Sequence, residues 1–343
     1  MSSIGYIQGL GGKGGYPPNW SELGYSDTPS GIIYAFDYAK YIANNWTTGT
    51  HISQFEGDKA LYFFPSGLDL SDWRYGSMFY NSNLMYIPPI TLGYTSGSHG
   101  NISLSSMFRG TGIREITILA VNDPASTGSH YYNDCFRDCR LLRTANINSN
   151  PKLGVADMFY GCIRLRTVTG LDTTGTQTFT EMFYNCVSLV EAPTLNTSSA
   201  TTITSLFYGC TSLATAPNYD FGNATSANNI FRGCSSLVTL PAYDFGKVTN
   251  MTYAFNGCTA LENVPIFNIT NTLKNMNMAF SGCPNLTDTS LDNILQMCIS
   301  ATGYTAAKTL QALGLQSSDY PAARWQTLPH YQDFLNAGWT GYS

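Results

Sequence analysis

An apolar pattern of Phe, Cys and Leu recurs along more than half of this chain. In the stretch Met182–Leu189, read as Met-Phe-Tyr-Asn-Cys-Val-Ser-Leu, the Cys follows the Phe by three residues and the Leu follows the Cys by three. Close copies return at intervals of 23 to 29 residues, with their Phe at Phe79, Phe108, Phe136, Phe159, Phe183, Phe207, Phe231, Phe255 and Phe280. A nearly fixed period of this length predicts a stacked repeat, in which each unit contacts only its neighbours.

The residues after each Leu predict how one repeat connects to the next. Four repeats carry a Pro four residues after the Leu and a large apolar residue two further on, at Pro193 and Leu195, Pro217 and Tyr219, Pro241 and Tyr243, and Pro265 and Phe267. We expect this segment to be extended and to stack into a parallel sheet. A polar turn follows, and then a short helical turn that places Ile203, Met251 or Met276 on one face with the next Phe.

The pattern divides the chain into four parts. Residues 1–27 are rich in Gly and Pro and predict an extended arm. Residues 28–76 predict an N-terminal cap, with a helix after Thr28-Pro29 and a strand at 60–65. Residues 77–287 hold the repeats, with inserted loops around 92–101 and 122–134. Residues 288–343 predict a helical C-terminal cap, with helices starting after Thr289, at about 305–313, and after Pro329.

The cysteines follow the repeat and not the pattern of a disulfide framework. Of nine cysteines, seven lie three residues after a repeat Phe: Cys139, Cys162, Cys186, Cys210, Cys234, Cys258 and Cys283. One Cys per coil cannot pair within its own coil, and Cys packs well as a small buried hydrophobe. We therefore predict a ladder of buried, reduced thiols; disulfides or a bound metal are the alternatives.

Composition excludes several classes of function. Charged residues make up 11% of the chain, against roughly 25% in an average soluble domain. The net charge of −5 comes without a basic run, so nucleic acid is not an expected partner. No apolar run approaches the ~18 residues of a spanning helix, so we expect no membrane insertion. The N-terminal residues lack the charged and apolar regions of a secretory signal.

Candidate catalytic groups are few and scattered. The four histidines, His51, His99, His130 and His330, occur in no recognisable motif, and the cysteines lie beside apolar residues. Paired acids for glycoside cleavage could come from Asp220 and Asp244, or from Glu191 and Glu262, although turn formation explains the same residues. We expect no catalytic residue, no metal site and no cofactor, and hence a protein that is not an enzyme.

The residue after each repeat Phe gives the strongest candidate binding surface. Next to a buried Phe it should point outward, so that stacking aligns Tyr80, Arg109, Arg137, Tyr160, Tyr184, Tyr208 and Arg232 in a stripe. Tyr and Arg are enriched at binding hot spots, and aromatic faces suit sugar rings. The alternative is a solvated face whose tyrosines pack between coils. A second candidate is the flat, uncharged sheet face formed by Val190, Thr194, Thr215, Asn218, Thr239 and Asn263.

The spacing of Phe183, Cys186 and Leu189, repeated from about Ser77 to Leu286, resembles the bacterial surface-protein type of leucine-rich repeat, the BspA-like group. The resemblance implies an α/β repeat solenoid, a right-handed superhelix with a parallel sheet on one face and short helices on the other. It also implies adhesion and contact with proteins or glycans. Members of that group are normally exported, whereas this sequence shows no signal.

These features together predict a non-enzymatic binding or structural protein. We expect a bacteriophage virion component, such as a tail or head fibre or a receptor-contact protein. Its arm would dock onto other virion proteins and its repeats would bind a host surface protein or glycan; a homo-oligomer is a further option. The alternative is a bacterial surface adhesin exported by another route, and a glycan-cleaving solenoid is a third hypothesis. The expected location is the virion, or in the alternative the bacterial cell surface.

Overall fold

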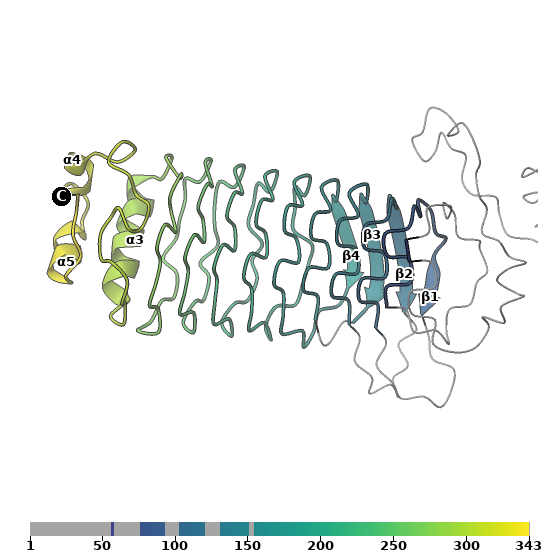
Figure 1. Cartoon of the computed structure of the whole chain (residues 1–343). Coiled ribbons are helices and arrows are strands. Elements are labelled where there is room, and N and C mark those ends of the chain that lie inside the picture. The colour runs from purple at the N-terminus through teal and green to yellow at the C-terminus, as the bar shows by residue number, and fades with distance from the viewer. Residues whose placement is uncertain (1–55, 58–75, 93–102, 121–130, 151–153, 343) are drawn as a thin grey trace, which may run out of the picture.

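The computed structural model describes residues 56–57, 76–92, 103–120, 131–150 and 154–342. In Figure 1 these residues form an elongated stack of coils, with a small sheet towards one end and helices at the C-terminal end. The predicted arm at 1–27, the helix after Thr28 and the strand at 60–65 lie outside the described residues. So do most of the two predicted loops at 92–101 and 122–134.

Four parallel strands form the sheet, in the order β1 (Ile90–Leu92), β2 (Glu115–Ala120), β3 (Thr144–Ser149) and β4 (Thr167–Leu171). Each strand belongs to one coil, and equivalent residues pair, so that Ile116 lies beside Ala145 and Ala145 beside Val168. These three side chains are buried, while alternate residues such as Thr144 and Asn146 face outward. The parallel sheet predicted from the sequence is confirmed for these coils.

The sheet does not continue through the repeats that carry Pro, where it was also expected. Thr169 of β4 pairs with Asn146, but the residue one period later is Pro193, which has no N–H to donate. In the described coils beyond this point only isolated bridges remain, among them Thr215 with Thr239 and Thr239 with Asn263. The prediction of a strand in every repeat is therefore wrong, and proline is the physical reason.

The segment around each repeat Phe is a series of turns and not the predicted short helix. In one coil the N–H groups of Met158, Tyr160 and Cys162 donate to carbonyls three residues earlier, at 3.0–3.1 Å. A helix cannot form because the residue two before the Phe and the residue two after it both have positive φ, as at Asp157 (57°) and Gly161 (70°). The predicted helices on the face opposite the sheet are thus replaced by turns in the described coils.

Alternating backbone handedness lets every second N–H in this segment face the next coil. Asp157 N–H donates to Thr180 O, Phe159 N–H to Met182 O and Gly161 N–H to Tyr184 O, at 2.7–2.9 Å. The same three bonds recur between successive coils and fix their register. Gly209 lies against Asn185 of the preceding coil. A side chain at position 209 would collide with the side-chain amide of Asn185.

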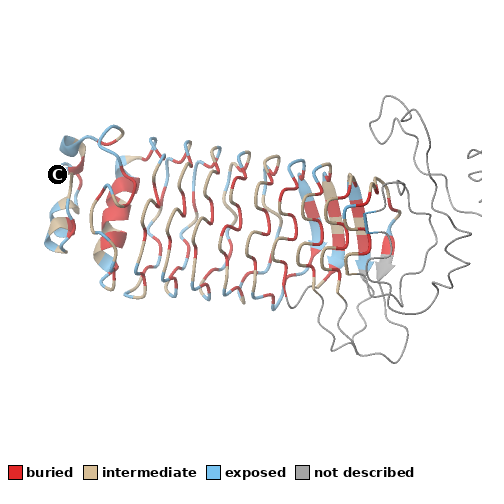
Figure 2. Cartoon of the chain, in the orientation of Figure 1, coloured by how far each residue is buried: buried red, intermediate tan, exposed pale blue. Residues whose placement is uncertain are grey.

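The core is a set of side-chain columns that run along the stack. Successive repeat phenylalanines from Phe79 to Phe280 stack with centroids 5.4–6.1 Å apart and are at most 1% exposed. Figure 2 shows buried residues recurring along every coil of the stack. Ile203, Met251 and Met276 are buried as well, so their predicted inward direction is confirmed although the turn that carries them is not helical.

All nine cysteines are buried free thiols, which confirms the predicted ladder. The seven repeat cysteines share one hydrogen bond, in which the thiol donates to the carbonyl of the repeat Phe in the preceding coil at 2.9–3.2 Å. Each Cys therefore both fills the core and satisfies a carbonyl of its neighbour. In the first coils Thr111 occupies this position, and its hydroxyl donates to Phe108 O of its own coil.

Helices follow the last coil. Helix α3 (Asp288–Ser300) is capped by Thr287, whose hydroxyl accepts from Ser290 N–H, so the cap lies two residues before the predicted one at Thr289. The predicted helix at 305–313 is wrong, because that segment forms turns and a bridge from Thr309 to Thr340. The short helices α4 (Ala322–Trp325) and α5 (Tyr331–Asn336) then complete the chain.

The thiol ladder generates a labelling prediction. A thiol reagent should modify few cysteines of the native protein and all nine after denaturation, because the native thiols are buried and burial raises the pKa of each of them. Intact mass measured before and after reduction provides the control. A mass lower by paired hydrogens, or rapid labelling of the native chain, would contradict the ladder.

Candidate binding surface

The position after each repeat Phe lies between a buried ring and a residue in the left-handed backbone region. This geometry turns the side chain away from the core, and all seven predicted residues, from Tyr80 to Arg232, are half-buried. Because the inter-coil bonds hold equivalent residues in register, the seven side chains form one continuous column. We call this column, consisting of Tyr80, Arg109, Arg137, Tyr160, Tyr184, Tyr208 and Arg232, the Tyr–Arg stripe.

The rings at the centre of the stripe stack on one another. Centroids are 4.5 Å apart between Tyr160 and Tyr184 and 4.3 Å apart between Tyr184 and Tyr208, with nearly parallel planes. Arg137 lies over the other face of Tyr160 at 4.0 Å, and Arg232 lies over Tyr208 at 5.5 Å. Both arginines are within the range of cation–π attraction. The faces of the three tyrosines are thus covered, and their edges and hydroxyls remain exposed to partners.

Two further contacts extend the stripe at its ends. Arg109 lies 5.5 Å from the ring of Tyr80, and Arg232 lies 4.5 Å from the ring of Tyr253. Tyr253 precedes its repeat Phe by two residues, so sequence reasoning, which followed only the residue after the Phe, missed it. Burial and the hydrogen bond with Tyr208 raise the pKa of Tyr184 to about 12, so the hydroxyl of Tyr184 is neutral at physiological pH.

A column of acids borders the stripe at the position two before the Phe. Asp134, Asp157 and Glu181 occupy this position in three successive coils. Arg137 Nη1 lies 2.5 Å from Asp157 Oδ1 and 3.3 Å from Asp134 Oδ1. One guanidinium therefore bridges two coils, with Arg109 3.6 Å from the same Asp134 oxygen. The sequence signal was available, since an acid recurs at this position, but its outward direction depends on a backbone conformation that the sequence did not predict.

The pKa of Asp157, the central residue of the acidic column, is raised in the folded chain. Burial raises the pKa of Asp157 to about 6; Arg137 opposes the rise, while Asp134 and a hydrogen-bonded Glu181 add to it. The folded chain therefore holds a proton on Asp157 more tightly than the unfolded chain, in which the pKa is about 3.9. By linkage, this group's contribution to stability is complete below about pH 4 and is lost as the pH rises towards 6.

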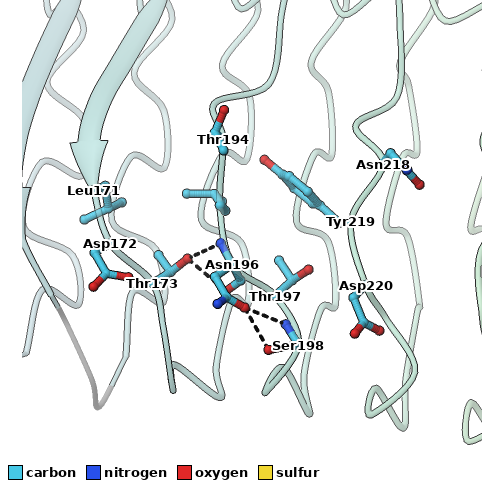
Figure 3. A pocket seen from close by; sticks show the side chains of 11 residues that line it. Leu171, Asp172, Thr173, Thr194, Asn196, Thr197, Ser198, Asn218, Tyr219 and Asp220 are labelled. Carbon is cyan, nitrogen blue, oxygen red and sulfur yellow. Dashed lines mark hydrogen bonds between the residues drawn. The ribbon is translucent and has the colours of Figure 1, made fainter.

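A hollow lies at the polar turns after the sheet, apart from the Tyr–Arg stripe. It has a volume of about 470 Å³, and its lining includes Leu171, Thr197 and Tyr219, as Figure 3 shows. Asn196 N–H donates to Thr173 Oγ1 at 2.8 Å, and most polar groups here are engaged in such turns. The Thr197 hydroxyl is buried without a protein partner. Thr194 and Asn218 of the predicted sheet face also line this hollow.

The groups considered for chemistry lie apart or are engaged in structure. Asp220 Oδ1 accepts from Gly222 N–H and Asp244 Oδ1 from Gly246 N–H, so both carboxylates hold turns. His330 Nδ1 lies 2.7 Å from Asp292 Oδ2 and joins α5 to α3. His51, His99 and His130 lie outside the described residues. In the described ranges no three His, Cys, Asp or Glu side chains are placed to hold a metal ion. The helices described there are too short or too polar to cross a membrane.

Comparisons with known proteins concern the repeats. Residues 137–239 and 177–294 match a family model described as a Mycoplasma protein of unknown function, DUF285. The match agrees with the repeat type expected from the Phe-Cys-Leu spacing. Among solved structures, the leucine-rich-repeat protein TpLRR of T. pallidum is 18% identical, with 61% of this chain and 82% of that chain covered and a TM-score of 0.33. No curated protein matches the chain.

The acidic column predicts that Glu181→Gln alters the pH dependence of stability. Loss of the neighbouring negative charge should lower the pKa of Asp157, because the charge of Glu181 contributes to the raised pKa. The variant should then be more stable than the wild type at pH 7, by about 0.5 kcal/mol for a partly exposed pair, and should lose less stability between pH 4 and 6. Thermal unfolding at several pH values measures both effects.

The matched control is Glu191→Gln, which removes an exposed acid outside this column. It should leave the pH profile of unfolding unchanged. A Glu181→Gln variant that is less stable at pH 7, or whose pH profile equals that of the wild type, would contradict the proposed coupling.

Proposed function

We propose that this chain is a non-enzymatic repeat protein that binds another protein along the Tyr–Arg stripe. The observation that carries the proposal is the continuous column from Arg137 through Tyr160, Tyr184 and Tyr208 to Arg232, held in register by backbone bonds. We also infer that the stacked coils are a leucine-rich-repeat superhelix of the right-handed kind that the resemblance implies. Such arrays commonly bind partners along one extended surface.

The geometry of the tyrosines favours a protein over a sugar as the partner of the stripe. Sugar rings bind to exposed aromatic faces, but both faces of Tyr184 are covered by Tyr160 and Tyr208. What remains is a row of ring edges and hydroxyls, with Arg137 beside Tyr160 at one end and Arg232 beside Tyr208 at the other. Edges, hydroxyls and arginines together are typical of protein hot spots. A glycan could bind the stripe only through hydrogen bonds.

Site-specific photocrosslinking tests the stripe. A photoreactive phenylalanine analogue at position 184 should crosslink the chain to a surface protein of the host cell. The same analogue at Asn256 is the matched control, because Asn256 also follows a repeat Phe but lies outside the stripe. Adding Arg137→Ala should weaken the crosslink at 184. Equal crosslinking at 184 and 256, or none at either position, would contradict the proposal.

The second part of the proposal concerns the particle or cell on which the protein acts. We propose a bacteriophage virion component, a tail or head fibre or a receptor-contact protein, whose residues 1–27 dock onto the particle. The alternative is a bacterial surface adhesin, and the match to a family described from Mycoplasma favours it. A glycan-cleaving enzyme is the third hypothesis, weakened by the engagement of Asp220 and Asp244 in turns; release of oligosaccharide from a host polysaccharide would support it.

Deletion of residues 1–27 distinguishes a virion component from a surface adhesin. In a virion component the truncated chain should fold, with an unchanged melting temperature of the repeats, and should be absent from purified particles. An adhesin should instead be found on cells and never in particles, with or without the arm. Particles that incorporate the truncated chain at the normal level would contradict the docking role.

A further inference from the structure

Five arginines gather on a surface to which the Tyr–Arg stripe does not extend. They lie in the connections that lead from the turns into strands β2, β3 and β4, at Arg114, Arg140, Arg143, Arg164 and Arg166. The sequence contains no basic run, because these residues belong to three separate coils. Stacking brings them together: Arg143 N–H donates to Arg114 O, and Arg166 N–H donates to Arg143 O at 2.9 Å. We call these five residues the arginine patch.

Three members of the patch have no acidic partner. Arg143, Arg164 and Arg166 are exposed and, among the described residues, form no ion pair. Some other arginines of the described residues are paired with acids, as when Arg137 bridges Asp134 and Asp157. Three arginines without an ion pair are thus grouped in neighbouring coils of a chain of net charge −5, where they raise the local concentration of anions.

A hollow of about 580 Å³ adjoins the patch. Arg140 and Thr111 line it, together with Asn83 and Asp138. The side chain of Arg140 is 70% exposed, and its guanidinium lies 3.9 Å from Asp138. The hollow therefore combines one exposed cation with hydroxyl, amide and carboxylate groups. Such a lining suits a ligand that carries both negative charge and hydroxyls.

The sheet face beside the patch is rich in hydrogen-bonding groups and carries one acid, Glu115, which lies beside Thr144 at the start of β2. Thr144 and Thr167 pair across β3 and β4, and Asn146 Oδ1 accepts from Thr169 Oγ1 at 3.3 Å. Neighbouring strands lie about 4.8 Å apart, so the backbone holds Arg143 and Arg166 at about that spacing, with one arginine in each coil. A linear polymer with a charge on each short unit and hydroxyls between the charges matches this arrangement.

We propose that the arginine patch binds an acidic polysaccharide, whose carboxylates pair with Arg143 and Arg166 and whose hydroxyls contact the threonine face. This surface and its ligand are distinct from the protein partner of the stripe. Single-stranded nucleic acid fits less well, because the described strands of this face offer threonine, asparagine and Glu115 and no aromatic ring on which bases stack. Guanidinium groups suit carboxylates through paired hydrogen bonds.

Binding of polygalacturonate to the full chain tests this proposal, with neutral dextran as the uncharged reference. The wild type should bind polygalacturonate and not dextran, with an affinity that falls as salt rises. The double variant Arg143→Gln/Arg166→Gln should bind on the order of tenfold more weakly. Its melting temperature should match that of the wild type, because both side chains are exposed.

The matched control is Lys247→Gln/Lys274→Gln, which removes the same charge from two exposed lysines elsewhere in the stack. It should retain the affinity of the wild type. An absence of polygalacturonate binding, or an equal loss in both double variants, would overturn the proposal. Tighter binding of poly-glutamate or of single-stranded DNA would overturn it too, and would assign the patch to an acidic protein or to nucleic acid.

Discussion

The backbone hydrogen bonds between successive turns are the interaction on which the rest of the molecule depends. At each junction the N–H groups at the repeat Phe and two residues to either side donate to the next coil, as Phe159 donates to Met182. They all face the same way because left-handed residues such as Asp157 and Gly161 alternate with right-handed ones. A non-glycine residue in that region carries strain of about 1 kcal/mol or more, which the bonds it permits offset.

Fixed register turns every recurring residue into a column. The buried columns of Phe, Cys and Leu follow directly, and each thiol adds a bond to the Phe carbonyl of the coil before it. Outward positions obey the same rule, so that Tyr160, Tyr184 and Tyr208 become a stack although they are 24 residues apart in sequence. Each coil therefore contributes one residue to each surface column, and a short run of sequence does not predict the composition of that column.

The sequence predicted the columns of side chains correctly, but it did not predict the backbone conformation that carries them. Burial of Phe183, Cys186 and Leu189 follows from recurrence alone, because only an inward position demands the same apolar residue in every coil. The turn was mistaken for a helix because a residue and the Phe four positions later face inward in both conformations. No residue type marks the left-handed position before the Phe, which holds Asp157 in one coil and Tyr253 in another. The prolines are visible in the sequence, but the loss of strand pairing follows only from the repeat register, in which Pro193 lies one period after Thr169 of β4.

Charge divides the outer surface of two neighbouring coils, those of Phe136 and Phe159. In the coil of Phe159, Asp157 precedes the stripe residue Tyr160, and Arg164 and Arg166 follow it. The coil of Phe136 repeats this order, with Asp134 before Arg137 and with Arg140 and Arg143 after it. The Tyr160 side chain therefore lies between an acidic column, whose charge Arg137 partly neutralises, and a basic patch with unpaired arginines. A partner with the reverse polarity can lie across the stripe in one orientation only, since turning it around would place like charges together. Orientation along the stack is limited in the same way, because the arginine patch is confined to the coils that carry β2, β3 and β4.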